Sequence, residues 1–98
     1  LKMSERDRLW DLINCLINGT YSPKNFCEEF TRIYEEEVDY SYLSYEEKQN
    51  FGEMSEMAAR YSDDEGKLKF INKYFSASDI IENAKDIKLR MLGLVEIF

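Results

Sequence analysis

Histidine is absent from this sequence of 98 residues, and cysteine is scarce. Without histidine the chain lacks the side chain that most often serves as a general base or a metal ligand. Two cysteines, Cys15 and Cys27, are too few for a structural zinc site, which takes about four cysteine or histidine ligands. We expect both thiols to be reduced and mostly buried, with a disulfide or a reactive thiol as the alternatives.

Long apolar runs are missing as well. No stretch approaches the ~20 residues that a membrane span requires, so we expect no membrane association. Residues 5–11 are mostly charged, so no apolar signal segment follows the N-terminus, and we expect a cytoplasmic protein. The hydrophobic share of 44% argues against disorder. These features predict one domain over residues 1–98, with frayed ends at 1–3 and 94–98.

Helical periodicity dominates the first third of the chain. A cap at Ser4 and a stop at Asn18-Gly19 bound the first predicted helix. Ser22 followed by Pro23 predicts the start of a second helix, which should end near Asp39. The residues expected on the inner faces of these two helices recur every three or four positions. They are Leu9, Leu12, Ile13, Leu16 and Ile17 in the first helix, and Phe26, Phe30, Ile33 and Tyr34 in the second.

Two further helices are predicted in the second half. Ser44 and Glu47 form a capping box for the third helix, in which Gly52 costs about 1 kcal/mol relative to alanine and therefore marks a close contact. Residues 67–75 fit either a short helical turn or an extended segment, and we favour the turn. Ser76 or Ser78 caps the last helix. The residues expected to face the core are Phe51, Met54, Met57, Ala58 and Tyr61, then Ile80, Ile81, Ala84, Ile87, Met91 and Leu92.

No segment has a convincing period of two, which would indicate a strand. Four amphipathic helices with short connections predict an all-α fold. The expected architecture is an antiparallel four-helix bundle.

Acidic residues are concentrated in the middle of the chain. The net charge is −7, and residues 28–65 hold thirteen acidic and three basic side chains, whereas both flanking segments are slightly basic. Such an asymmetry concerns binding partners more than the fold. A surface of this sign repels phosphates, so we expect no direct nucleic-acid binding. The same surface fits the basic groove of a protein that itself binds nucleic acid, although a face that only keeps the protein soluble is the alternative.

Paired carboxylates occur throughout this segment, but the sequence does not favour an enzyme or a metal protein. Adjacent acids on a helix point in different directions, so most of them should be solvated, whereas a catalytic pair needs one desolvated member. Glu53 and Glu56 have the spacing of a di-iron bundle but lack the partner histidines. Residues 63–66 lack the ligand spacing of an EF-hand. We expect no catalytic residue, no metal and no cofactor.

Tyrosines accompany the acidic segment. Tyr34 and Tyr61 are expected in the core with a solvated hydroxyl. Tyr40, Tyr42 and Tyr45 lie in the turn between the second and third helices, where burial of all three is difficult. Exposed tyrosines among carboxylates indicate an interface for a basic partner rich in hydrogen-bonding groups.

Several short sequence elements occur in a characteristic order across residues 9–92. They are Leu16 to Ser22, then Phe26 with Phe30, Tyr34 and the acids behind it, then Leu43-Ser44 with Glu46-Glu47, and finally Ala58 to Ser62 ahead of an acidic loop. This order resembles the colicin D immunity family, which includes immunity proteins of contact-dependent growth inhibition systems.

The resemblance implies a helical bundle that binds the C-terminal toxin domain of a bacterial competition effector. In this family the toxin is usually a ribonuclease that acts on transfer RNA, and the immunity protein covers its basic active-site groove. The implied binding residues are Asp63, Asp64 and Glu65 of the loop, Glu53 and Glu56 on the helix before it, and a second group of Glu35, Glu36, Glu37 and Asp39. Tyr40, Tyr42 and Tyr45 are our candidates for an aromatic anchor.

The segment after the acidic loop departs from the acidic pattern, because it contains Lys67, Lys69 and Lys73, and it would confine the contact to one edge.

An alternative function from a different class is that of a non-enzymatic acidic adaptor, or a nucleic-acid mimic, that binds some other basic protein. The sequence does not indicate whether the isolated protein forms a homo-oligomer.

Overall fold

Each of the four longer helices begins after a serine whose hydroxyl accepts a hydrogen bond from the backbone amide three residues later. Such caps satisfy amides that the first helical turn leaves without a partner. The predicted starts are therefore confirmed, with Ser76 rather than Ser78 as the last cap. The helices are α1 (Glu5–Asn18) after Ser4, α2 (Pro23–Arg32) after Ser22, α3 (Tyr45–Ala59) after Ser44, and α5 (Ala77–Met91) after Ser76.

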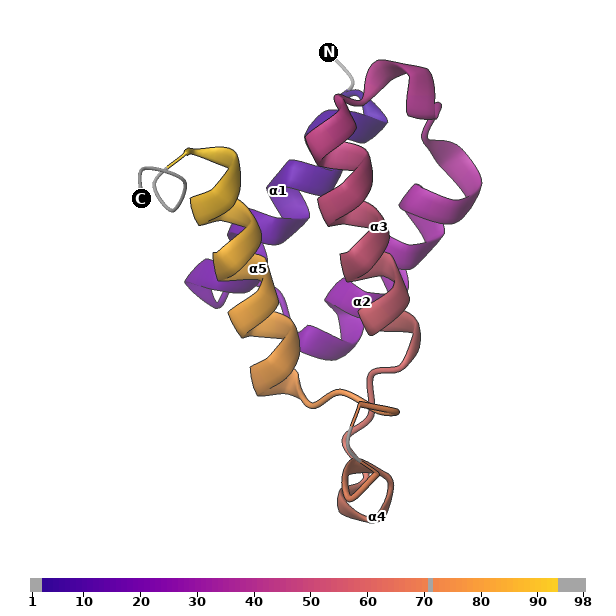
Figure 1. Ribbon diagram of the computed structural model, residues 1–98, viewed down its shortest axis with the longest axis vertical. Helices are drawn as coiled ribbons and strands as arrows, with labels where there is room; N and C mark the ends of the chain where they lie inside the picture. Colours follow the sequence, from indigo (N-terminus) through magenta and orange to yellow (C-terminus); the bar gives the residue numbers. More distant parts are fainter. Residues whose placement is uncertain (1–2, 71, 94–98) are drawn as a thin grey trace.

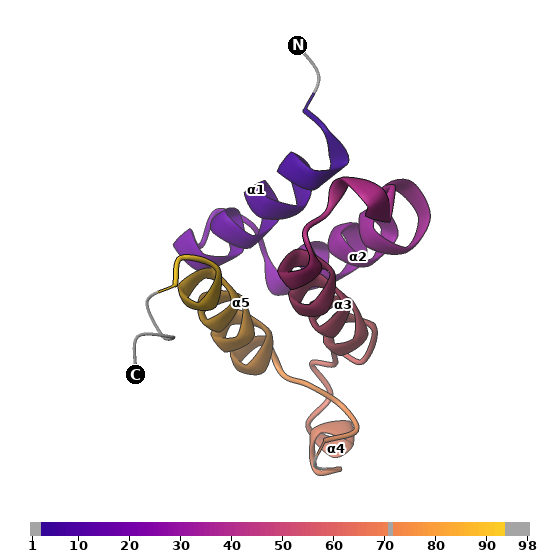
Figure 2. The same cartoon turned by 45° about the horizontal axis from the view of Figure 1, so that its top comes forward.

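The computed structural model describes residues 3–70 and 72–93, and these are all-α, as predicted. Three short helical pieces complete them, η1 (Ile33–Glu37), η2 (Tyr40–Tyr42) and α4 (Glu65–Leu68). Helices α1 and α3 each contact both α2 and α5. Helix α4 lies at the tip of an arm that projects away from these four helices (Figures 1 and 2). The predicted fraying of residues 1–2 and 94–98 lies outside the described residues.

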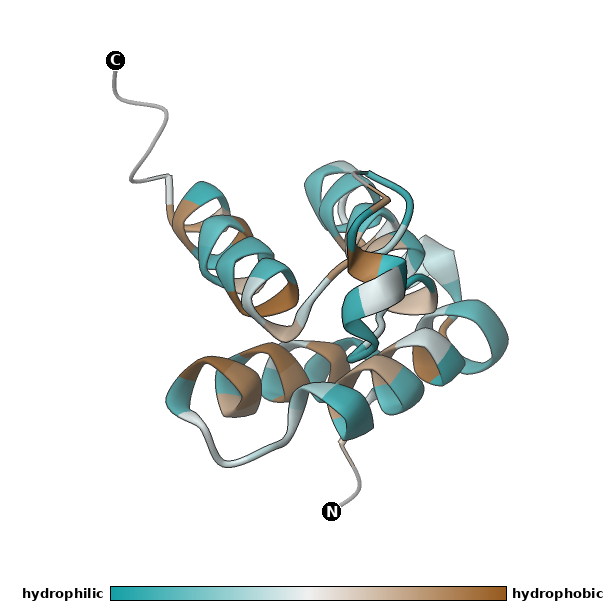
Figure 3. Cartoon of the chain, turned by 90° about the horizontal axis from the view of Figure 1, so that it is seen from below, coloured by the Kyte–Doolittle hydropathy of each residue, from teal (hydrophilic) through white to brown (hydrophobic). Residues whose placement is uncertain are grey.

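Three fully buried phenylalanines occupy the centre of the core. The ring of Phe30 lies 5.1 Å from that of Phe26 and 5.7 Å from that of Phe51, the latter pair edge to face. Burial of each such side chain contributes about 1.5–3 kcal/mol. The apolar faces of the helices turn inward around this centre (Figure 3). The predicted residues that are also buried are Leu9, Ile13, Leu16, Ile33, Met54, Ala58, Ile80, Ala84 and Ile87.

One prediction about a single residue in the helices is wrong. Leu92 does not face the core but is 62% exposed, because α5 ends at Met91 and Leu92 already lies past its last turn. Glu47 forms the predicted capping box with Ser44, and it is only 1% exposed because Arg6 and Trp10 of α1 also reach its carboxylate. The helical turn favoured for residues 67–75 lies earlier, at Glu65–Leu68.

The end of α2 is irregular in a way that the periodicity did not indicate. At η1 the chain forms a π-helical turn, in which the amide of Val38 donates to the carbonyl of Ile33, 2.9 Å away and five residues earlier. The turn buries Tyr34, whose hydroxyl donates to the carbonyl of Lys48 at 3.3 Å instead of being solvated as expected. A Cβ at Gly52 would lie 3.2 Å from that hydroxyl, which agrees with the close contact predicted at this glycine.

Candidate functional site

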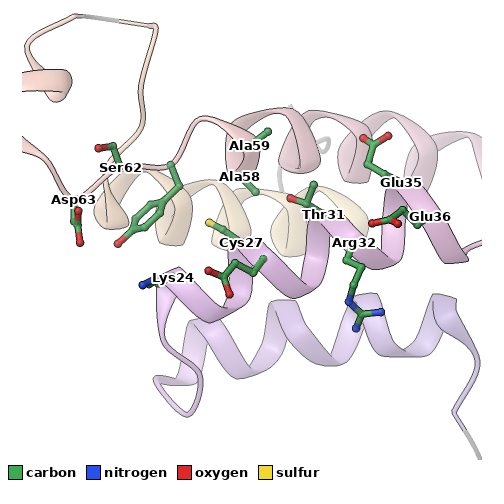
Figure 4. A pocket seen from close by; sticks show the side chains of 12 residues that line it. Lys24, Cys27, Thr31, Arg32, Glu35, Glu36, Ala58, Ala59, Ser62 and Asp63 are labelled. Carbon is green, nitrogen blue, oxygen red and sulfur yellow. The ribbon is translucent and has the colours of Figure 1, made fainter.

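A groove of about 620 Å³ runs between α2 with η1 on one side and the C-terminal end of α3 with the following residues on the other (Figure 4). The spacing of three and four residues on α2 places its lining side chains on one face of the helix. Lys24, Cys27, Glu28, Thr31, Arg32, Glu35 and Glu36 line the first side, and Ala58, Ala59, Tyr61, Ser62 and Asp63 line the second.

Negative charge exceeds positive charge in this groove, with four carboxylates against two cations. The guanidinium of Arg32 is already paired with Glu29, at 2.8 Å, and with Glu37. Within residues 3–70 and 72–93, no ion pair involves the groove carboxylates Glu28, Glu36 and Asp63. These groups therefore face the groove with charges that a basic partner can neutralise.

One carboxylate of the groove has an internal partner. The hydroxyl of Ser55 on α3 donates to Glu35 at 2.9 Å, which joins η1 to α3 across the groove wall. Ser55 is buried, so this hydrogen bond anchors the carboxylate of Glu35 to α3. Both Glu35 and the next residue, Glu36, are exposed.

The floor of the groove is apolar. Cys27 and Ala58 are almost fully buried there, and Ala59 adds a second small side chain. Burial, followed by the negative charge of Glu28, raises the pKa of the Cys27 thiol to about 12. The thiol is therefore protonated at neutral pH and is a poor nucleophile. Cys27 serves as an apolar contact, and both cysteines are free thiols.

The predicted acidic loop is divided between two roles. Asp63 lines the groove, whereas Asp64 caps α4, where its carboxylate accepts a hydrogen bond from the amide of Gly66 at 2.8 Å. The amide of Asp64 itself donates to the hydroxyl of Ser62 at 3.0 Å. Glu65 is the first residue of α4 and is exposed. Of the three acids, Asp63 alone is thus brought together with the acids of α2 and η1.

Glu53 and Glu56 lie on exposed positions of α3 that do not line the groove. Glu53 is 3.6 Å from Arg90 of α5, and Glu56 is 3.3 Å from Arg60 one turn later. Exposed pairs of this kind are worth at most ~1 kcal/mol, so they can exchange partners. The structure therefore separates these two acids from the group formed by Glu36 and Asp63.

The three candidate anchor tyrosines are exposed, as predicted. Tyr42 is 76% and Tyr45 68% exposed, whereas Tyr40 is held by stacking on Tyr34 at a ring distance of 4.9 Å. Asp39 caps η2, and hydrogen bonds from the hydroxyl and amide of Ser41 lower the pKa of its carboxyl group. Asp39 thus organises the turn that presents these rings, here named the tyrosine turn (residues 39–45).

Sequence reasoning missed the residues of α2 that line the groove. Lys24, Cys27, Glu28 and Thr31 carry the same three- and four-residue spacing as the buried face of α2. This second, mostly polar stripe was the signal that could have identified them.

Among the described residues, no group of three or more acidic or cysteine side chains is placed to hold a metal ion. No described helix has the length and apolarity needed to cross a membrane. No protein-family model, curated protein or solved structure matches this chain.

Proposed function

We propose that this chain is an immunity-type protein that binds and neutralises a basic nuclease toxin domain. Because the sequence resembles the colicin D immunity family, we propose that this nuclease is a tRNase. The immunity-type protein acts in the cytoplasm as a non-enzymatic inhibitor. The proposal rests on the groove, where no described residue forms an ion pair with Glu28, Glu36 or Asp63.

Electrostatics provides the mechanism. A nuclease that holds RNA must present Lys and Arg side chains to the phosphates. Carboxylates on the walls of the groove can pair with these cations, speed the encounter and exclude the RNA. Tyr42 and Tyr45 are exposed at the tyrosine turn and are suited to anchor the complex in pockets of the partner.

An antiparallel four-helix bundle is the architecture that we propose to support this surface. Helix α1 contacts α2 and α5, α3 contacts the same two helices, and α2 also contacts α5. The groove lies where α2 and α3 meet, so these two helices form its walls.

Two carboxyl groups have the charge state opposite to that of a catalytic acid. A catalytic acid at neutral pH needs a raised pKa. Burial raises the pKa of Glu47, but hydrogen bonds from Arg6, Ser44 and Trp10 outweigh it, and hydrogen bonds from Ser41 lower the pKa of Asp39. Both groups are therefore stabilised as carboxylates, and Glu47 is buried with its charge paired to Arg6.

The test is co-purification with the product of the adjacent upstream gene, followed by a tRNA cleavage assay with and without this protein. We expect a stable complex and loss of cleavage. The charge-reversal pair Glu36→Lys and Asp63→Lys should abolish protection, whereas the matched pair Glu82→Lys and Asp86→Lys on α5 should retain it. Circular dichroism should show equal helicity for both pairs.

Protection that survives reversal at Glu36 and Asp63 would contradict the placement of the site in the groove. A co-purified partner that is basic but cleaves no RNA would contradict the nuclease and favour the acidic adaptor. Association should also slow steeply as salt rises, since steering by charge is screened.

A further inference from the structure

The groove has the dimensions of a peptide site. Lys24 and Glu35 lie eleven positions apart at its two ends, which corresponds to ~16 Å at the rise of a helix. An extended segment of ~5 residues spans that length. The strand spacing of ~4.8 Å and the sheet spacing of ~10 Å give such a segment a volume of roughly 770 Å³.

A helix would enter the same open groove only in part. At a diameter of ~10–12 Å, a helix of equal length occupies roughly 1,300–1,800 Å³. The groove holds about 620 Å³, so an extended segment can lie almost wholly within it, whereas most of a helix would protrude. The small side chains of Ala58 and Ala59 allow the backbone of such a segment to approach the floor closely.

We propose that the groove binds an extended basic segment of the partner, with Arg or Lys side chains directed to Glu28 and Glu36. The identity of the partner rests on the proposed function, whereas the form of the bound segment follows from the groove itself. Figure 4 shows Lys24 and Asp63 toward one end of the groove and Glu35 with Glu36 toward the other. Lys24 lines the same end as Asp63, whereas Arg32 is already paired with Glu29 and Glu37, so the principal cation binds toward Glu36.

Thr31 provides an independent observation in the same groove. Its hydroxyl oxygen is buried, with less than 1 Å² exposed, and no residue within 3–70 or 72–93 forms a hydrogen bond with it. A buried hydroxyl without a partner costs about 1–3 kcal/mol, so such groups in native proteins call for an explanation. A change of rotamer that turns the hydroxyl of Thr31 into the groove would let a donor from the bound segment supply that partner.

The experiment uses the full chain and the peptide acetyl-Gly-Arg-Gly-Arg-Gly-amide, followed by NMR of the side-chain methyl groups. We expect shifts at Thr31, Ala58 and Ala59. The same peptide with citrulline in place of arginine should bind about tenfold more weakly, as expected for the loss of a charged hydrogen bond. Equal binding of the two peptides, or shifts confined to other surfaces, would overturn the proposal.

Two pairs of variants separate the groove from general effects. Ala59→Leu fills the groove and should weaken binding at least about tenfold, whereas Gln49→Leu, an exposed position of α3 outside it, should leave binding unchanged. Glu36→Gln should weaken binding severalfold, whereas Glu82→Gln on α5 should not. Equal effects within either pair would overturn the proposal.

Thr31→Val distinguishes a role in peptide binding from a purely structural role. Because no internal hydrogen bond is lost, the free protein should be at least as stable, while the peptide binds more weakly. A less stable free protein with unchanged binding would show that the hydroxyl has an internal role, and would remove this support.

The proposal and the proposed function can fail separately. Peptide binding in the groove together with a partner that is not a nuclease would retain the former and reject the latter. Neutralisation of a nuclease that is insensitive to Ala59→Leu would do the reverse.

Discussion

Replacement of Glu47 by alanine tests how a buried carboxylate ties α1 to the start of α3. The carboxylate accepts hydrogen bonds from Nε of Arg6 at 3.0 Å, from Nε1 of Trp10 at 2.7 Å and from the amide of Ser44 at 2.8 Å. A second guanidinium nitrogen of Arg6 lies 2.8 Å from its other oxygen. Glu47 therefore closes the capping box of α3 and also binds two side chains of α1.

The magnitude follows from these contacts. Loss of the capping interaction costs about 1 kcal/mol. Loss of the hydrogen bond to Trp10 costs about 1 kcal/mol, and loss of the bidentate contact to Arg6 costs about the same. Arg6 is half-exposed, so its charge returns to water without the penalty of an isolated buried ion. We expect Glu47→Ala to destabilise the protein by about 3 kcal/mol, or about 15 °C in Tm for a domain of this size.

The assay is urea and thermal unfolding followed by helical circular dichroism. Glu46→Ala is the matched control, because Glu46 occupies the same first turn but is exposed. It should change the free energy of unfolding by at most about 0.5 kcal/mol. Equal losses for the two variants would refute the importance of the buried network.

A pH series adds a second check with Glu47→Gln, which resembles the protonated side chain. Burial alone would raise the pKa of Glu47, but the hydrogen bonds from Arg6, Ser44 and Trp10 with the charge of Arg6 lower it. The stabilisation by the carboxylate is therefore fully present above the ordinary glutamate pKa of ~4.3 and is lost as pH falls through the lower folded-state pKa. The gap between wild type and variant should narrow in acid. A constant gap would contradict this linkage.

Three further predictions concern single positions. Gly52→Val should destabilise by about 2 kcal/mol because its side chain meets the Tyr34 hydroxyl, whereas Gly52→Ala should stay within about 1 kcal/mol, as thermal unfolding would reveal. Gly19→Ala should cost about 1 kcal/mol in the same assay, because Gly19 has a φ of 83° at the end of α1. At neutral pH, Cys15 should be alkylated well before Cys27, whose raised pKa of about 12 and burial suppress the thiolate; peptide mass spectrometry that finds the reverse order would contradict this.

The helix starts could be predicted from the sequence because a cap depends on four consecutive residues. Ser22 with Asn25, and Ser44 with Glu47, contain all the atoms that form the caps. The inner faces were predictable for a similar reason, since periodicity along one helix defines them. Leu92 failed because periodicity alone does not say where a helix ends.

The placement of charge could not be predicted because it depends on contacts between distant segments. The burial of Glu47 is set by Arg6 and Trp10, which lie 41 and 37 positions away in sequence. Composition located the acids in the central segment, but contacts with Arg90 and Ser55 direct Glu53 toward α5 and Glu35 toward α3. A sum of charges over a segment contains no information about these directions.

The π-helical turn at Ile33–Glu37 has a consequence for how such a surface diversifies. A π turn differs from a regular helical turn by one residue, and one residue corresponds to a rotation of roughly 100° about the helix axis. Removal of a single codon here would turn the residues that follow by this angle, and the contacts of η1 with α1 and α3 would have to adjust. The direction in which this end of the molecule presents its charge can therefore change in one genetic step, provided that the buried side chains of Ile33 and Tyr34 are accommodated.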